Sequence, residues 1–208
     1  MAKIGAEQAF RIANGAYESA KGIIRELSEL AQASNPKFRF EVALRQYDWI
    51  LQATLLTVAV QDGTYHPMEN AFIRRITDEG DILKLFNDEM RTQDARLPML
   101  TWDNFKSLLE GFDEETRKKL MDGILLCADR YSGDFVKWFA PIDAADARDY
   151  LAELDRLTAK ILVSFSATDG EDLDDATDRS TNIGREVGKG LELHGLLLSQ
   201  KWRKMMNG

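Results

Sequence analysis

The residues best placed to do chemistry are acids close to an Asp-Gly pair in the first half of the chain. An apolar segment ends at Asp62 and Gly63, and Glu69 follows shortly after. Carboxylate and carbonyl oxygens are the ligands that Ca²⁺ and Mg²⁺ prefer in proteins. Asp62, Glu69 and the backbone carbonyls of residues 63–65 therefore predict a divalent-cation site. Because only two side chains are obvious ligands, we expect weak binding, on the order of 10⁻⁴ to 10⁻³ M.

A helix connection that needs no ion is the alternative for this loop. Gly63 suits the left-handed cap at the end of a helix, and Asp62 can accept hydrogen bonds from nearby amides. Glu69 then lies in the first turn of the next helix, where its charge interacts favourably with the helix dipole. The residues alone leave both interpretations open.

The same pattern occurs a second time. Residues 55–63 read LLTVAVQDG and residues 162–170 read LVSFSATDG, so both apolar segments end at Asp-Gly. Either a duplicated helix-Asp-Gly-helix unit or two independent amphipathic helix ends would explain the match. The second loop is rich in acids, and its candidate ligands are Asp169, Glu171, Asp174 and Asp175. These acids lack the order of a calcium loop, and the alternative is a solvated turn whose acids favour the next helix N-terminus.

Other reactive residues carry little catalytic signal. His66 and His194 belong to no zinc-ligand pattern, and the sequence has no phosphate-binding, dinucleotide-binding or nucleophile-elbow motif. Cys127, the single cysteine, lies in the apolar run GILLCAD and is expected to be a buried thiol. The enzymatic alternative is a carboxylate-rich helical hydrolase that uses Mg²⁺. That enzyme would need acids from several helices to meet in one cavity.

The composition indicates a folded, acidic protein. The chain has 208 residues, of which 44% are hydrophobic, and a net charge of -8. It can therefore bury a core, whereas its negative charge disfavours binding to nucleic acid or to anionic membranes. No segment has the ~20 apolar residues of a transmembrane helix, and the first residues do not resemble a signal peptide. We expect a cytoplasmic protein.

Apolar residues recur at helical spacing along almost the whole chain. Steps of three and four residues put them on one face of successive helices, whereas the alternation typical of strands is missing from the sequence. Proline, glycine and the N-cap residues Thr101, Asp113 and Asp143 set the expected ends. The expected helices cover residues 6–33, 40–61, 67–80, 82–86, 102–111, 114–139, 144–167 and, with an interruption allowed, 172–205.

The fold predicted from these elements is all-α, a multi-helix bundle. No linker rich in Pro, Gly or Ser divides the sequence, so residues 1–208 are expected to form one domain, with residues 87–98 as the only plausible seam. The periodic stripes predict a buried core that contains Phe10, Leu51, Leu55, Val58, Phe72, Ile73, Leu125, Leu162 and Phe165.

The first Asp-Gly loop and its surroundings resemble a known family. An apolar helix ends in Ala59-Val-Gln-Asp62-Gly63, and Tyr65, the run Pro67-Met-Glu69 and a helix with Phe72-Ile73-Arg-Arg-Ile76 follow. This arrangement resembles the TerB-like domains of tellurite-resistance proteins and of membrane-anchored DnaJ-like co-chaperones, over residues 41–80 and more loosely over residues 41–135. The resemblance implies a small helical bundle with a stress-linked, membrane-associated or partner-binding role, whose acidic loops hold divalent cations. It does not imply catalysis.

The function that fits these observations best is a noncatalytic helical module that binds a partner protein. A weak response to Ca²⁺ or Mg²⁺ at the first Asp-Gly loop is expected to tune that binding. The sequence does not identify the partner, and self-association into a homo-oligomer stays open.

Overall fold

The computed structural model describes residues 5–60, 65, 67–90, 99–166 and 196–207, and within these ranges the chain forms eight α-helices and no strand. The predicted all-α bundle is therefore confirmed. The helices are α1 (Ala6–Ser34), α2 (Phe40–Ala59), α3 (Pro67–Ile76), α4 (Ile82–Met90), α5 (Phe105–Gly111), α6 (Glu114–Trp138), α7 (Ala144–Ser166) and α9 (Leu198–Asn207).

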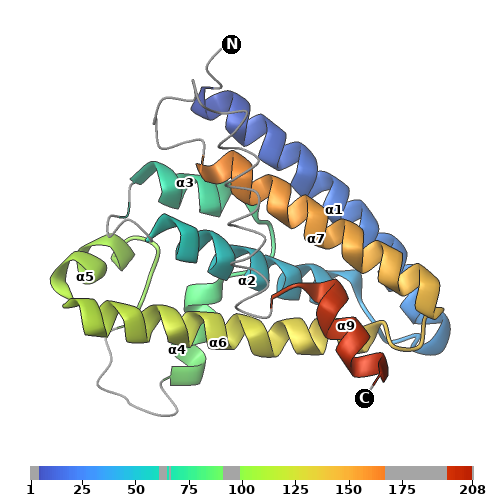
Figure 1. Ribbon diagram of the computed structural model, residues 1–208. Coiled ribbons are helices and arrows are strands. Elements are labelled where there is room, and N and C mark those ends of the chain that lie inside the picture. The colour runs from blue at the N-terminus through green and yellow to red at the C-terminus, as the bar shows by residue number, and fades with distance from the viewer. Residues whose placement is uncertain (1–4, 61–64, 66, 91–98, 167–195, 208) are drawn as a thin grey trace.

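Four long helices make the frame of the bundle (Figure 1). The antiparallel helices α1 and α7 pack along each other, and α2 packs against both of them and, on another side, against α6. The shorter helices fill the remaining sides: α3 contacts α1 and α2, α4 contacts α2 and α6, and α9 contacts α6 and α7. α2 is therefore the central helix, and side chains on several of its faces reach different neighbours.

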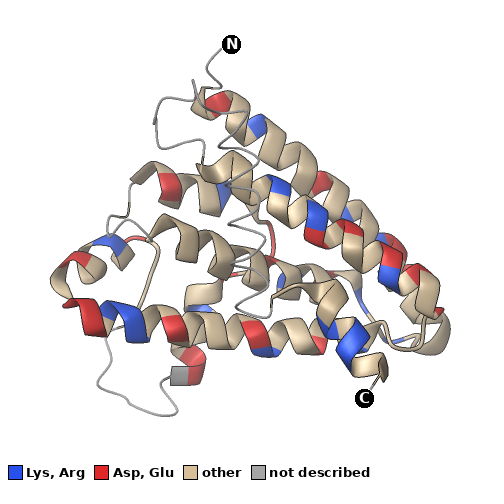
Figure 2. Ribbon diagram, in the orientation of Figure 1, with Lys and Arg blue, Asp and Glu red and all other residues tan. Residues whose placement is uncertain are grey.

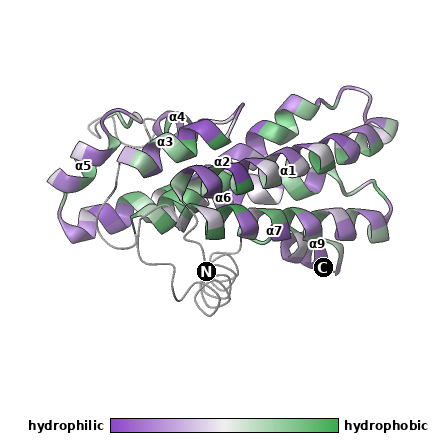
Figure 3. Cartoon of the chain, turned by 90° about the horizontal axis from the view of Figure 1, so that it is seen from above, coloured by the Kyte–Doolittle hydropathy of each residue, from purple (hydrophilic) through white to green (hydrophobic). Residues whose placement is uncertain are grey.

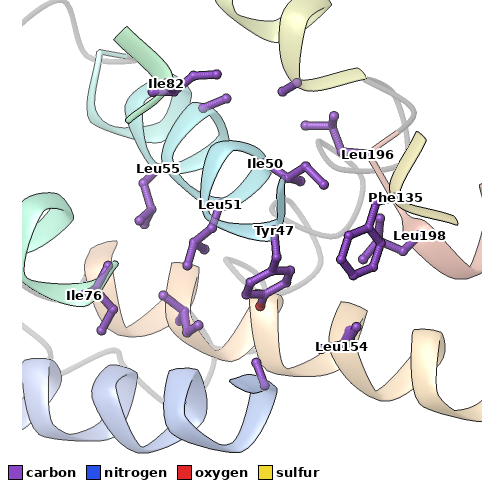
Figure 4. Packing of buried hydrophobic residues seen from close by; sticks show 14 of the residues in the cluster. Tyr47, Ile50, Leu51, Leu55, Ile76, Ile82, Phe135, Leu154, Leu196 and Leu198 are labelled. Carbon is purple, nitrogen blue, oxygen red and sulfur yellow. The ribbon is translucent and has the colours of Figure 1, made fainter. Parts of the chain in front are cut away.

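The core is a cluster of apolar side chains around α2. Figure 4 shows Tyr47, Leu51 and Leu55 extending from one side of this helix, while Ile50 lies on another side near Leu196. The hydroxyl of Tyr47 also bonds to that of Thr158 on α7, at 2.8 Å, so even the polar tip of this buried ring has a partner. Burial of these side chains supplies most of the stability of such a bundle.

The predicted core residues are mostly where the sequence placed them. The buried ones are Leu51, Leu55, Phe72, Ile73, Leu125, Leu162 and Phe165. Phe10 and Val58 are only half-buried, which corrects the expectation for these two. Phe10 lies in the second turn of α1, where its ring packs edge-on against Phe72 and the guanidinium of Arg75 covers its face at 4.0 Å from the ring centre. One face of the Phe10 ring is thus covered by a charged group that stays hydrated and not by an apolar neighbour, so the ring is only half-buried.

Most helix ends also agree with the sequence. Asp113 caps α6 by accepting a hydrogen bond from the Thr116 amide at 2.7 Å, and Asp143 accepts one from the Ala145 amide at 2.9 Å. α5 begins later than the expected residue 102, because the Thr101 amide bonds to the Asn104 side chain at 2.7 Å and a turn precedes the helix.

Two further helices differ from their expected extent. α3 ends at Ile76 and does not continue to Gly80, since a side chain from α2 takes the backbone amides of the next residues, as described below. Of the expected helix over 172–205, the part up to residue 195 lies outside the described residues, and α9 begins within the remainder, at Leu198. The proposed cap at Gly63 is likewise outside the described residues.

Acids and bases alternate along the outer faces of the long helices (Figure 2). Several form ion pairs within one helix, such as Lys119 with Glu115 at 2.6 Å and Lys137 with Asp134 at 2.9 Å. Such exposed pairs contribute only about 0.3 to 0.5 kcal/mol each. Figure 3 shows hydrophilic and hydrophobic residues side by side on the same helices, as expected for helices that are amphipathic.

Candidate functional site

The structure places only part of the first predicted cation site. Asp62 lies outside the described residues, while Glu69 lies in the first turn of α3, as expected. Its carboxylate is not on the surface, because only 2% of the residue is exposed. The Tyr65 ring, which packs edge-on against Phe105 at 5.2 Å, is buried too. Burial, and secondly the charge of Glu69, raise the pKa of Tyr65, so its phenol stays protonated.

Two oxygen atoms in this region are buried and, within the described part of the chain, lack a hydrogen-bond partner. They are the hydroxyl oxygen of Tyr65 and the side-chain oxygen of Asn70. The amide nitrogen of Asn70 is used, since it donates to the carbonyl of Trp102 at 2.7 Å and ties α3 to the segment before α5. Buried acceptors without a partner mark places where a water molecule or an ion would be favourable.

The second predicted cation site cannot be compared with the fold, because Asp169, Glu171, Asp174 and Asp175 all lie outside the described residues. Among the residues that are described, no group of three or more His, Cys, Asp or Glu side chains is arranged to hold a metal ion. Both cation sites therefore stay predictions.

One buried acid that accepts four hydrogen bonds was not suggested as a site by the sequence. Asp48 lies in the middle of α2 and is fully buried. Its Oδ1 accepts a hydrogen bond from the Tyr17 hydroxyl of α1 at 2.7 Å. Its Oδ2 accepts three from consecutive backbone amides between α3 and α4, those of Asp78, Glu79 and Gly80, at 3.2, 2.7 and 3.0 Å.

Gln52, one helical turn after Asp48, holds the ends of the same connection. Its side-chain nitrogen donates to the Thr77 hydroxyl at 2.7 Å and to the Gly80 carbonyl at 2.9 Å. Its side-chain oxygen accepts the Ile82 amide at 2.8 Å, which is the start of α4. Asp48 and Gln52 together explain why α3 stops at Ile76, since the amides that could continue the helix are bound by side chains of α2.

Ion pairs surround this connection on both sides. Lys21 of α1 contacts the Asp78 carboxylate at 2.5 Å, and Arg45 of α2 contacts Glu79 at 4.0 Å. The hydrogen bond from Lys21 to Asp78 raises the pKa of the lysine. Burial raises the pKa of Asp48 to about 6, because the hydrogen bonds that favour the charged form only partly offset the loss of water.

One signal in the sequence could have identified Asp48. The apolar stripe of the expected helix 40–61 includes Leu44, Leu51 and Leu55. Asp48 stands four residues after Leu44 and three before Leu51, so it falls on the buried face. A charged residue on such a face must be paired or hydrogen-bonded, which makes it a candidate for special attention.

Two other reactive groups have structural roles. Cys127 is a buried thiol, as expected, and donates to the carboxylate of Glu89 at 3.2 Å. Burial raises the pKa of Cys127 to about 12, which keeps it a poor nucleophile. Asp155 of α7 accepts the amides of Leu198 and Ser199 at 2.8 and 3.0 Å and thereby caps α9.

Large apolar side chains are exposed toward one end of the bundle. We call this set the apolar end, and it consists of Leu30, Val42, Trp138 and Met206, which are 42, 38, 37 and 45% exposed. They lie where α1 ends, α2 begins, α6 ends and α9 ends (Figure 1). Phe38, in the connection from α1 to α2, packs against the Trp138 ring in a tilted arrangement with 5.0 Å between ring centres.

No protein-family model, curated protein or solved structure matches the chain. None of the helices in the described ranges is both long and apolar enough to cross a membrane.

Proposed function

We propose that the chain is a noncatalytic helical module that binds a partner protein, and that the apolar end forms the contact. The single observation that carries this proposal is the exposure of Leu30, Val42, Trp138 and Met206 toward one end of the bundle. Isolated exposed apolar residues are common on protein surfaces, but several near the same end of a bundle are candidates for an interaction site. Trp is also among the residues that contribute most to binding at interfaces.

The hydrogen bonds of two acids, the buried Asp48 and the half-buried Asp155, support a binding role over the Mg²⁺-dependent hydrolase. Asp155 accepts two backbone amides, and Asp48 accepts three backbone amides and the Tyr17 hydroxyl, so both acids bind groups of the chain itself. A hydrolase of that class would instead direct several carboxylates from different helices toward one metal-filled cavity. Asp155 therefore caps α9, and Asp48 holds the connection between α3 and α4.

The cation response belongs to the same proposal. Glu69 and Asp62 would be the side-chain ligands, and the partnerless oxygens of Tyr65 and Asn70 support the presence of an additional bound group near the start of α3. A stress-linked role is part of the proposal because the residues around this loop resemble TerB-like domains.

Substitutions at the apolar end test the binding role. We expect the double variant Leu30→Glu, Val42→Glu to lose the partner, because charges replace apolar contact surface, with affinity at least about tenfold weaker. Leu126→Glu is the matched control, since Leu126 is 70% exposed on α6 and lies outside the apolar end. A protein retained by the wild type is purified and its affinity for the three chains is measured by calorimetry. Equal affinity for all three would remove the apolar end from the proposal.

Two further measurements test the remaining parts. Light scattering of the purified chain reports whether the partner is a second copy of the chain. Titration with Ca²⁺ or Mg²⁺, followed by NMR, is expected to shift the amides of residues 68–70 saturably, with the effect lost in Asp62→Asn. Amides that do not move at about 10 mM of either ion, well above the expected affinity, would contradict the cation site.

A further inference from the structure

The connection between α3 and α4, residues 77–81, is held by two side chains of α2 in different ways. Gln52 binds its two ends, at Thr77 and Ile82. Asp48 binds its middle, through one oxygen that accepts the amides of residues 78–80. Gln52 also donates to the Gly80 carbonyl and the Tyr17 oxygen also accepts the Asp78 amide, but Asp48 is the one charged acceptor that binds all three of these amides.

We propose that Asp48 is a proton-operated latch, which loosens the amides of residues 78–80 when it takes up a proton while Gln52 keeps both ends of the connection in place. This inference concerns regulation of the fold and does not depend on the proposed binding role. It stands on the convergence of four hydrogen-bond donors on one buried acid.

The geometry indicates which oxygen takes the proton. Oδ2 of Asp48 already accepts three amides, whereas Oδ1 has one partner, the hydroxyl of Tyr17. A proton on Oδ1 turns this oxygen into a donor, so Tyr17 must rotate its own proton away and accept. The Tyr17 oxygen also accepts the amide of Asp78 at 3.1 Å, and an oxygen with two lone pairs can accept both. One proton from solvent is taken up, the O–H bond on Oδ1 is the only covalent bond that forms, and the hydrogen bond between Tyr17 and Asp48 reverses its direction.

Neutralisation weakens the bonds at the other oxygen. Hydrogen bonds to a charged carboxylate are roughly twice as strong as those to a neutral group. When Asp48 is protonated, the hydrogen bonds from the three amides of residues 78–80 all become weaker together. The bonds made by Gln52 are neutral in both states, so they are unaffected.

Burial is the main reason that this change is accessible in mildly acidic solution, and the nearby charged groups are largely paired with one another. Lys21 from α1 and Arg45 from α2 pair with Asp78 and Glu79 of the connection, and the hydroxyl of Tyr17 is neutral. Glu18 of α1 is also in contact with Lys21. Burial sets the pKa of Asp48 at about 6, with the amides and Tyr17 opposing the rise and the charge of Asp78 adding to it.

The latch reaches the surface through Gly80. A Cβ placed on Gly80 would lie 3.2 Å from the Trp49 ring, so the connection packs directly against this side chain. Trp49 in turn packs edge-on against Tyr131 of α6, with 4.7 Å between ring centres. Arg130 lies over Tyr131 and pairs with Glu89 of α4. Release of the connection is thereby transmitted to the contact between α2, α4 and α6.

An NMR titration of the whole chain tests the proposal. Between about pH 7.5 and about pH 4.5, the amides of residues 78–80 are expected to shift with one common midpoint near that of the Asp48 carboxyl carbon. The amides of Thr77 and Ile82 are expected to move much less. The proposal is overturned if the three amides do not titrate in this range, or if their midpoint differs from that of the Asp48 carboxyl carbon.

Variants distinguish the protonation of Asp48 from other effects of low pH on the amides of residues 78–80. In Asp48→Asn the common midpoint should disappear, whereas Tyr17→Phe should raise it, because the Tyr17 hydroxyl favours the charged carboxylate. Asp103→Asn is the control, since Asp103 is an exposed acid that pairs with Arg74 of α3. It should leave the titration of residues 78–80 unchanged. A titration that persists in Asp48→Asn excludes the latch, and the wild-type comparison still decides the matter if that variant does not fold.

Discussion

Asp48 shows how a buried charge can be tolerated without an ion-pair partner. Moving an ionised carboxylate out of water is costly unless hydrogen bonds replace the lost hydration. Four donors reach Asp48, three of them backbone amides whose positions are fixed by the connection between α3 and α4. The pKa of Asp48 is nevertheless raised, which means that the hydrogen bonds only partly replace water.

The first prediction is a pH-dependent contribution of Asp48 to stability. Its pKa in the folded chain, about 6, lies above the ordinary 3.8, so the folded state binds the proton more readily than the unfolded state. The stabilisation is therefore fully present below about pH 4 and is lost as the pH rises through about 6, with a total on the order of 3 kcal/mol. Proton uptake thus loosens one connection locally while raising the overall free energy of unfolding, because it removes a buried charge.

Urea unfolding of the wild type and of Asp48→Asn at several pH values checks this prediction. As the pH rises, the unfolding free energy of the wild type should fall relative to that of Asp48→Asn, because only the wild type acquires the buried charge. A difference that is constant with pH, or that moves in the opposite direction, would show that the hydrogen bonds outweigh the desolvation of Asp48.

The second prediction concerns the close approach of Gly80 to α2. A Cβ at this position would lie 2.5 Å from the Asp48 Cβ and 3.1 Å from the Arg45 carbonyl oxygen. Gly80→Ala must therefore push the connection away from α2, and we expect a loss of about 1 to 3 kcal/mol in unfolding free energy.

Gly22→Ala is the matched control for Gly80→Ala. Gly22 lies within α1, and nothing stands within 4 Å of an added Cβ. This substitution should stabilise the chain by up to about 1 kcal/mol, because Ala is the better helix former. Equal effects of the two substitutions in a denaturant titration would mean that the contact between Gly80 and α2 relaxes freely.

At the scale of elements, α9 is attached by three different contacts. Asp155 of α7 accepts its first two amides, Lys201 reaches Asp129 of α6 at 2.5 Å, and Trp202 is buried. The amides that open a helix have no partners within it, so a carboxylate supplied by another helix replaces a local cap. The cap therefore also fixes where α9 begins on the surface of α7.

The third prediction is that Asp155→Ala weakens the attachment of α9. The loss of a cap costs about 0.5 to 2 kcal/mol, and faster hydrogen exchange should be found in the amides of α9 before it is found in α1. Asp155→Asn should restore part of the protection, because its side-chain oxygen still accepts a hydrogen bond. Asp149→Ala, which removes an exposed acid from the same helix, should have no effect on α9. Unchanged exchange in Asp155→Ala would show that Trp202 and Lys201 suffice.

The helices themselves could be predicted because their signals are local. The expected ranges 114–139 and 144–167 differ from α6 and α7 by one residue or less at each end, since Asp113 and Asp143 cap the helices that follow them. Apolar spacing within one helix also suffices to predict that Leu51 and Leu55 are buried. Information of this kind does not require knowledge of which helices are neighbours.

The Asp48 cluster could not be predicted, because its partners are set by packing. The carboxylate is 31 residues from the Tyr17 hydroxyl and 32 from the Gly80 amide, and no short-range pattern links them. The early end of α3 was missed for the same reason, since Gly80 suggested a later stop. The candidate ligands near Asp62 and Asp169, by contrast, came from local loop patterns, and their roles stay predictions.

At the scale of the whole molecule, the expected seam at residues 87–98 is bridged by one side chain. Asn87 at the end of α4 donates to the carbonyl of Leu100 at 2.7 Å and accepts the Leu100 amide at 2.9 Å. Both residues are buried. The cluster of apolar residues around α2 also includes members from both sides of residues 87–98, such as Leu51 and Phe135. These contacts favour one cooperative unit.

The last prediction is that the chain unfolds in a single transition. Tryptophans at positions 49, 102, 138 and 202 lie on α2, before α5, at the end of α6 and on α9, so they report from both sides of the seam. Four variants, each keeping one of them and carrying Trp→Phe at the other three, are unfolded in urea and followed by fluorescence and circular dichroism. In each variant the two signals should have the same midpoint, because helix content and local packing are lost together in a two-state transition.

Two independent units would contradict this prediction by unfolding at different urea concentrations. The fluorescence of the variant that keeps Trp49 would then follow one part of the loss of helix content, and the fluorescence of the variant that keeps Trp102 would follow the other part. Asn87→Ala sharpens the test, since it removes the bridge across the seam without changing any tryptophan. If the midpoints still coincide in that background, the shared core around α2 is sufficient to make residues 5–207 cooperative, and the bridge contributes stability alone.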